Sequence, residues 1–310
     1  MKQFLTVSVL TATAASGIRL AIPFLLASLG ETMGQRSGVL NLGVDGIMLL
    51  GAFGAYLTAL HTHSLVLGVV VGVGVGAVMG VLTAVVNVTL KAQQGISGIG
   101  IYLFGLGFSD LLFQKLVGTP TPIDSLPLIK IPGLASIPVI GKIFFQHGLL
   151  VYGALLLVPV FAFVLNRTTY GTNIKAVGEN PAAADSLGVS VARIRYSTVI
   201  LGSMMAGLGG AALALELGIF QSNLTQGLGF IAIALVYFGA WRPWGVLTGS
   251  LLYGLVAAVV LTWKTLGIIP ASASDLASMA PAVITVVALV FVARRVRQPA
   301  ALAIAYERGR

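Results

Sequence analysis

Polar side chains inside long apolar runs are the first candidates for function in this sequence. Asp45 lies about two helical turns into the apolar run that begins near Gly38, and Glu216 lies close to the end of another run. Charged groups are costly in a bilayer and usually face a cavity or a partner. Hydroxyls and flat rings of a small polar solute could bind such groups, neighbouring amides and aromatic rings. The candidate pathway residues are Asn41, Asp45, Phe53, Glu216, Asn223, Gln226 and Tyr237.

These residues also have purely structural interpretations. Asp45 could pair with Arg19 or Arg36 and fix the packing of two helices. Glu216 could contact solvent or a solute-binding protein at an outer mouth. Packing is the commoner role of aromatic rings in apolar helices, here Phe53 and Tyr237.

The sequence carries no recognisable catalytic set. It has no Cys and only three His, and it contains neither an HExxH motif nor a GxxxxGK[ST] phosphate-binding loop. We therefore predict that the chain is not an enzyme and binds no metal or cofactor. Any ATP-driven function must use a motor on another chain, which would hold the ATP and magnesium.

Composition sets the class of protein. Of the 310 residues, 57% are hydrophobic and 9% are charged, whereas soluble chains carry about 25% charged residues. The repeated apolar runs indicate a multi-span α-helical membrane protein. The net charge of +9 fits Lys and Arg collecting on the cytoplasmic side, and we expect no nucleic-acid binding.

The elements that position these residues form an all-α transmembrane bundle, a single domain over 1–310. A bilayer needs about 20 apolar residues per helix. This rule predicts about nine spans, with a range of eight to ten, near 4–29, 38–60, 64–90, 96–117, 147–166, 196–218, 226–241, 244–265 and 277–293. Arg19 interrupts the first span, which could be bent or split in two, and 226–241 is short enough to be re-entrant.

Basic residues predict the orientation. Twelve Lys and Arg fall on one side of these spans and five on the other, so the first side should be cytoplasmic. The C-terminus is then inside, and the N-terminus is outside if the first segment crosses once. The Pro-rich segment 118–146 lies outside as a surface loop, and the polar segment 167–195 lies inside. Trp241 and Trp244 flank a cytoplasmic boundary as interfacial anchors.

The inner segment 167–195 contains a short capped helix. Asn180 is the expected N-cap, Pro181 the first helical residue and Gly188 the terminator. Spacing alone leaves two readings open: a solvated connection, or a surface helix that passes force between a soluble partner and the spans.

The stretch "AVGENPAAADSLG" (176–188) resembles the coupling loop of bacterial ABC-transporter permeases for branched-chain amino acids, ribose-type sugars and nucleosides. The following "VARIRYSTVILGSMMAGLGGA" (191–211) is also similar to that family. The resemblance implies that this loop docks on the ATPase subunit. The coupling residues it implies are Gly178, Glu179, Asn180, Pro181, Ala182, Ala183, Ala184, Asp185 and Gly188.

Two further stretches resemble the nucleoside branch of the family: "GQRSGVLNLGVDGIMLLGAFGAY" (34–56) and "GLGFIAIALVYFGAWRPWG" (227–245). The resemblance implies an inner-membrane importer subunit that moves a nucleoside by alternating access. It also implies an ATPase subunit, a second, non-identical permease, and a solute-binding lipoprotein or periplasmic protein. Ribose-type sugars and branched-chain amino acids remain alternative solutes. An ion-coupled secondary transporter and a membrane-embedded enzyme are alternatives of other classes.

Overall fold

The computed structural model describes residues 6–293 and 297–307. Seven helices are long and apolar enough to cross a membrane: α1 (Val7–Arg36), α2 (Val44–Thr62), α3 (Leu65–Ala84) with its π-helical extension η1 (Val85–Thr89), α4 (Gln94–Leu116), α6 (Leu149–Arg167), α9 (Val191–Leu217) and α11 (Pro243–Thr265). Two apolar helices are shorter: α10 (Leu228–Phe238) and α13 (Ala280–Ala293). The predicted polytopic helical bundle is thereby confirmed.

The first apolar segment is one continuous helix. α1 has 30 residues and contains Pro23, so the sequence-based option of two separate helices is wrong. Arg19 does not break it, because its guanidinium donates to Ser16 Oγ at 3.1 Å and lies 3.8 Å from the Glu216 carboxylate. A charge with such partners is tolerated inside an apolar run.

The small elements all lie in the connections. Segment 118–146 holds α5 (Ile140–Phe144) and the strand β1 (Leu128–Lys130), which pairs antiparallel with β2 (Gln146–Gly148), so the chain is not strictly all-α. Segment 167–195 holds α7 (Thr169–Glu179) as well as the expected short helix α8 (Pro181–Ser186). The connection between α11 and α13 contains η2 (Ala271–Ala273) and α12 (Ser274–Ser278).

Helix α9 is the central helix of the bundle and packs against α1, α2 and α3. Glycines allow this close approach, because a methyl group at Gly72 would lie 2.8 Å from Ala211 Cβ, and one at Gly30 would lie 2.6 Å from Gly202 O. Small residues at helix interfaces let backbones approach closely. The Gly-rich face of α3 is therefore used within the chain.

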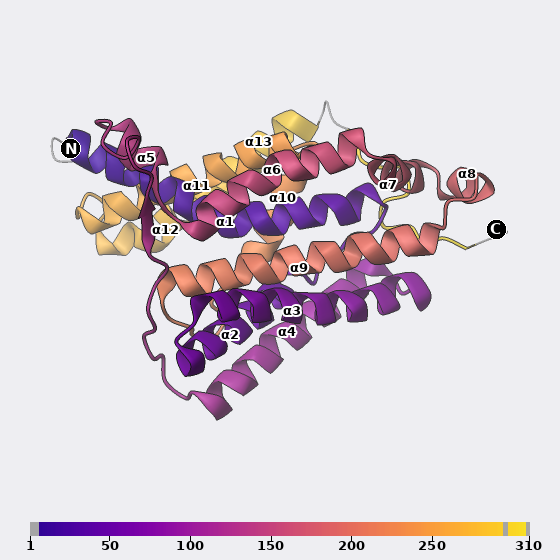
Figure 1. Cartoon of the computed structure of the whole chain (residues 1–310), viewed down its shortest axis with the longest axis horizontal. Helices are drawn as coiled ribbons and strands as arrows, with labels where there is room; N and C mark the ends of the chain where they lie inside the picture. Colours follow the sequence, from indigo (N-terminus) through magenta and orange to yellow (C-terminus); the bar gives the residue numbers. More distant parts are fainter. Residues whose placement is uncertain (1–5, 294–296, 308–310) are drawn as a thin grey trace.

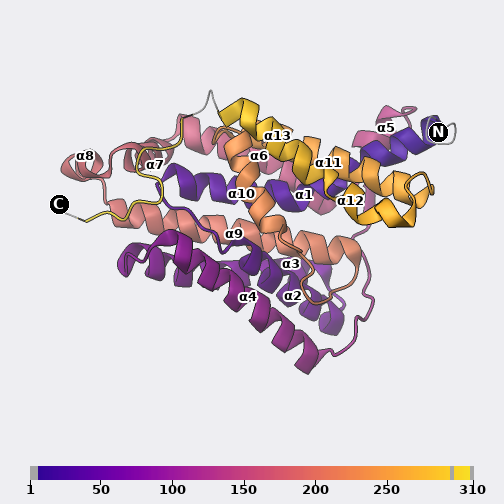
Figure 2. The ribbon, with the colours of Figure 1, turned by 180° about the vertical axis from the view of Figure 1, so that it is seen from behind.

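Different elements lie at the two ends of the bundle. The N-terminal end of α1 lies beside α5 and α12, whereas the described C-terminal segment lies beside α7 and α8 at the opposite end (Figure 1). The reverse view shows the same separation (Figure 2). We call these the α5/α12 end and the α7/α8 end.

Candidate transport site and coupling surface

The connection between α1 and α2 is irregular and folds back into the bundle. The span expected over 38–60 is therefore wrong at its start, since α2 begins only at Val44. The backbone N–H of Asn41 donates to Glu31 Oε1 at 3.0 Å, and that of Leu40 donates to Gln94 Oε1 at 2.8 Å. Asn41 Oδ1 accepts from the Gly43 N–H at 2.9 Å. Side chains thus satisfy backbone groups that would be costly to leave unpaired in a membrane.

Asp45 joins the first turns of α2 and α10. Its buried carboxylate accepts hydrogen bonds from the Gly229 N–H at 2.7 Å and from Thr225 Oγ1 at 3.0 Å. The suggested ion pairs with Arg19 or Arg36 are not formed among the described residues, because Arg19 instead pairs with Glu216. A carboxylate at a helix N-terminus satisfies free N–H groups and favours the helix dipole.

A second buried chain of side chains ties α1 to the residues after α10. Trp241 Nε1 donates to Gln35 Oε1 at 2.7 Å, and Gln35 Nε2 donates to Glu31 Oε1 at 3.1 Å. All three side chains are buried, so Trp241 is not the interfacial anchor expected, whereas Trp244 is exposed. Sequence reasoning missed Glu31 because it ended the first span at residue 29. The feature of the sequence that could have revealed Glu31 is an acidic residue beside an apolar run.

A cavity of about 500 Å³ is lined by α1, α6, α9, α10 and α11 and by Leu126 of segment 118–146. Most of its lining is apolar, but Arg19, Glu216 and Ser16 place a cation, an anion and a hydroxyl in its wall. We call it the Arg19 cavity. Tyr253 adds an aromatic ring to the wall. The cavity can thus offer donors, acceptors and apolar surface to a small solute.

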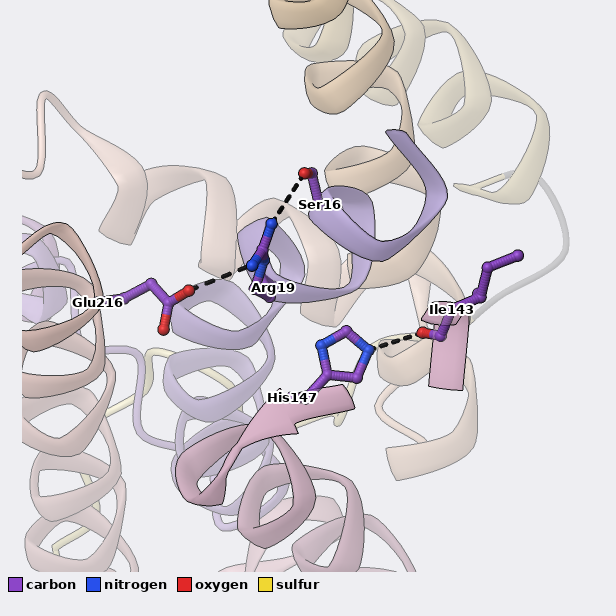
Figure 3. A network of polar contacts seen from close by, with 5 residues as sticks. All are labelled: Ser16, Arg19, Ile143, His147 and Glu216. Atoms are coloured by element: carbon purple, nitrogen blue, oxygen red, sulfur yellow. Dashed lines mark hydrogen bonds and ion pairs between the residues drawn. The ribbon is translucent and has the colours of Figure 1, made fainter. Parts of the chain in front are cut away.

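His147 lies near Arg19 (Figure 3). Its Nε2 is 2.6 Å from the Ile143 carbonyl oxygen, and its buried Nδ1 has no hydrogen-bond partner. Burial has the largest effect and lowers the pKa of His147 below its usual 6.5. The Ile143 hydrogen bond opposes this shift, Arg19 adds to it, and Glu216 opposes it least. The ring is therefore neutral at neutral pH.

The structure brings only one of the seven candidate pathway residues, Glu216, to the described wall of this cavity. Phe53 packs edge-on against Phe220, with ring centroids 5.3 Å apart, and Tyr237 packs on Trp241. The connection from α9 to α10 exposes two others, Asn223 and Gln226, both with positive φ. Asn41 and Asp45 hold the α1–α2 connection and the start of α10, as described above.

The expected capped helix in 167–195 is present as α8, at the extremity of the α7/α8 end (Figure 1). Asn180 Oδ1 accepts from the Ala183 N–H at 3.0 Å, Pro181 opens the helix, and Gly188 has φ +85°. Leu187 follows the helix with 84% of its surface exposed. The helix therefore presents an apolar side chain to its surroundings at the extremity of the bundle.

The C-terminal segment 297–307 braces this end. The Ala301 N–H donates to Gly178 O at 2.8 Å, and the Ala303 N–H donates to Gly38 O at 3.1 Å. The buried guanidinium of Arg195 donates to Ile304 O at 2.9 Å and to Ser37 O at 3.2 Å. The segment therefore links α7, the α1–α2 connection and α9.

Comparison with known proteins decides the family. The family described as branched-chain amino acid transport system, permease component, matches residues 13–293. The chain belongs to this family of ABC-transporter permeases. The permeases of this family are non-catalytic membrane subunits that act with a separate ATPase and a solute-binding protein.

Three relatives illustrate its range. The permease is 38% identical over 256 residues to TsgC13 of Haloferax volcanii, named as a glucose ABC transporter permease, covering 81% of this chain and 77% of TsgC13. It is 32% identical over 305 residues to the guanosine permease NupQ of Bacillus subtilis, covering 94% of both chains. It is 33% identical over 277 residues to the nucleoside permease NupC of Lactococcus lactis, covering 86% of this chain and 87% of NupC.

A second permease from each of these organisms also matches, with identities of 24% for NupP, 26% for NupB and 27% for TsgB13. No solved structure matches the chain.

Proposed function

We propose that this permease carries a nucleoside across the membrane as one half of a permease pair. The observation that carries the proposal is the similarity to the guanosine permease NupQ over 94% of both chains. The Arg19 cavity supports it, because ribose hydroxyls and the polar edge of a base suit the donors and acceptors of Arg19, Glu216 and Ser16.

In this proposal the α7/α8 end is cytoplasmic and the chain crosses the bacterial inner membrane nine times. The seven long helices and α13 each make one crossing, and the short α10 makes one together with the irregular residues 218–227 before it. The orientation follows from the excess of basic residues at that end. Helix α8 and its neighbours Gly178, Glu179 and Gly188 dock on the ATPase. ATP-driven closure of the ATPase then pushes on α8, and the permease alternates between outward and inward access.

The second subunit is a non-identical permease. In all three organisms named above the chain is more similar to one permease than to the other: 32% against 24% in B. subtilis, 33% against 26% in L. lactis and 38% against 27% in H. volcanii. This consistent difference supports a pair of two unlike permeases, in which this chain takes the place of NupQ. A lipoprotein or periplasmic protein delivers the solute to the α5/α12 end.

Glucose is the second candidate solute, because TsgC13 shares 38% identity with this chain. An uptake assay distinguishes between the two candidate solutes. Vesicles holding both permeases and the ATPase receive radiolabelled guanosine with its binding protein, with unlabelled nucleosides, glucose or a branched-chain amino acid as competitors. Competition by nucleosides alone supports the proposal. Competition by glucose overturns the nucleoside but keeps the importer, and uptake without ATPase overturns the importer.

The role of the Arg19 cavity is tested with Glu216→Gln and Arg19→Gln. The Arg19–Glu216 pair is one-third exposed, and such pairs contribute at most about 1 kcal/mol, so both variants should fold. We expect the half-saturating solute concentration to rise about ten-fold or more, because each variant loses one hydrogen bond between the solute and a charged side chain. Lys91→Gln breaks the other described ion pair, Lys91–Glu307, and should leave uptake unchanged. Equal uptake in all variants would remove the cavity from the pathway.

A further inference from the structure

A basic cleft of about 860 Å³ opens at the α7/α8 end and shares no lining residue with the Arg19 cavity. The C-terminal ends of α1 and α6 form it, together with α7 and the start of α11. Arg36, Lys175 and Arg242 line it, and its described lining contains no Asp or Glu. A cleft with three cations and no acid in its wall attracts anions.

Neutral groups hold two of these cations in place. Arg36 Nε donates to the Trp241 carbonyl oxygen at 3.1 Å, and Lys175 Nζ donates to Asn166 Oδ1 at 3.0 Å. Burial and the neighbouring Arg36 lower the pKa of Lys175. Glu179 is close enough to Arg36 to interact with it electrostatically, which leaves the cleft with an excess of positive charge.

The start of α11 adds further donors. Arg242 is its N-cap residue and makes no side-chain capping hydrogen bond, and Pro243 occupies the first helical position. The next two residues of this first turn, Trp244 and Gly245, line the cleft. The N-terminal N–H groups of a helix lack partners within the helix, and its dipole adds partial positive charge. This helix end strengthens a site that the three cations already define.

Apolar surface borders the cleft on both sides. Phe163, one turn before Asn166 on α6, is 61% exposed, and Trp244 on α11 is 56% exposed. Val160 and Leu252 extend these exposed apolar faces along the two helices. A free phosphate needs only the charges, whereas a ligand with a phosphate and acyl chains uses the charges and both apolar faces. Basic pockets between membrane helices are a known form of headgroup site.

We propose that the basic cleft binds the phosphate headgroup of an anionic phospholipid, whose acyl chains lie along α6 and α11. In the orientation proposed above, the lipid belongs to the cytoplasmic leaflet. Arg36 and Lys175 contact the phosphate from the inner wall, Arg242 contacts it from the rim, and Trp244 lies at the level of the headgroup. The lipid joins α6 and α7 to the start of α11, beside the proposed coupling helix.

Native mass spectrometry of the two detergent-purified permeases, with and without the ATPase, tests this site. Phosphatidylglycerol is titrated against phosphatidylcholine into the wild type and into Lys175→Gln/Arg242→Gln. We expect phosphatidylglycerol to bind the wild type about 30-fold more tightly than the double variant, since two cations at a membrane surface are removed. Lys130→Gln/Lys142→Gln removes two lysines of segment 118–146 and should bind like the wild type.

Three results would overturn the proposal: equal binding to the double variant, displacement of the lipid by millimolar inorganic phosphate, or loss of the lipid when the ATPase joins the permeases. The second result would assign the cleft to a free phosphate and the third to an acidic surface of the ATPase. Should the double variant unfold, Arg242→Gln alone gives the same comparison, because Arg242 is exposed and its side chain makes no described hydrogen bond.

Discussion

The carboxylate of Asp45, in the first turn of α2, accepts a 2.7 Å hydrogen bond from the backbone N–H of Gly229, in the first turn of α10. Two helices far apart in sequence therefore begin at the same buried point. α10 has only 11 residues, about 16 Å of helix, which is roughly half of a bilayer core. Asp45 allows this short helix to start inside the bundle.

Gly229→Ala should destabilise the protein at this junction. A methyl group at position 229 would clash with the backbone of Asp45 and with its Cβ, and overpacking of this kind costs about 1–3 kcal/mol. Thermal unfolding in detergent measures the effect as a lower midpoint. Gly74→Ala on α3 is the matched control, since nothing lies within 4 Å of its added methyl group. Equal midpoints for the two variants would contradict the close contact.

Asn180→Ala should weaken coupling to the ATPase. It removes the acceptor of the Ala183 N–H, and loss of an N-cap costs a helix about 1 kcal/mol. We expect ATP-dependent uptake to fall several-fold while the amount of folded permease stays constant. Asn180→Ser keeps a good N-cap and should restore uptake. Full uptake by the Ala variant would count against α8 as the coupling element.

Stability should depend on pH through His147. The pKa of the folded ring lies below the usual 6.5, so below pH 6.5 the unfolded chain binds more protons than the folded one. Stability is then independent of this group above pH 6.5 and falls as the pH drops below that value. Unfolding midpoints across this range measure the slope. His147→Gln, which can still donate toward Ile143 O, should lose this part of the slope, and an unchanged slope would contradict the assignment.

Removal of the C-terminal segment should destabilise the α7/α8 end. A chain that ends at Gln298 loses the Ile304 carbonyl and leaves the buried guanidinium of Arg195 without one of its acceptors. Leaving a buried donor unpaired costs about 1–3 kcal/mol. Proteolysis within α7 and α8, followed by mass spectrometry, should accelerate in the truncated chain. Glu307→Gln, which affects the exposed pair with Lys91, is the control and should show the wild-type cleavage rate.

Local signals in the sequence were sufficient for some elements. Asn180, Pro181 and Gly188 predicted α8 correctly, because capping and termination depend on neighbouring residues. The long apolar runs predicted the long helices, because hydrophobicity is also a local property of the sequence. Gly68, Gly72 and Gly76 lie four residues apart in the sequence, which favours a close-packed face on α3. This spacing does not show that α9 is the helix packed against that face.

The rest depends on contacts between distant segments. Residues 37–43 look like the start of a span in the sequence, but they are irregular in the structure. Glu31 and Gln94, from other parts of the chain, accept hydrogen bonds from their backbone, and no local pattern reveals these contacts. Helix α7 was missed because its polar composition is that of a loop. The Arg19 cavity was missed except for Glu216, since its wall comes from five helices whose alignment no local pattern encodes. Pathway roles remain predictions for all seven candidates: Asn41, Asp45, Phe53, Glu216, Asn223, Gln226 and Tyr237.

The brace made by residues 297–307 has a consequence for biogenesis. These residues come after the last apolar helix, α13, yet their backbone pairs with Gly178, beside the proposed docking helix, and with Gly38, after the first helix. A nascent chain cannot make these contacts until all the apolar helices have been synthesised. The surface proposed to meet the motor subunit therefore takes its final form only after the last of these helices has emerged.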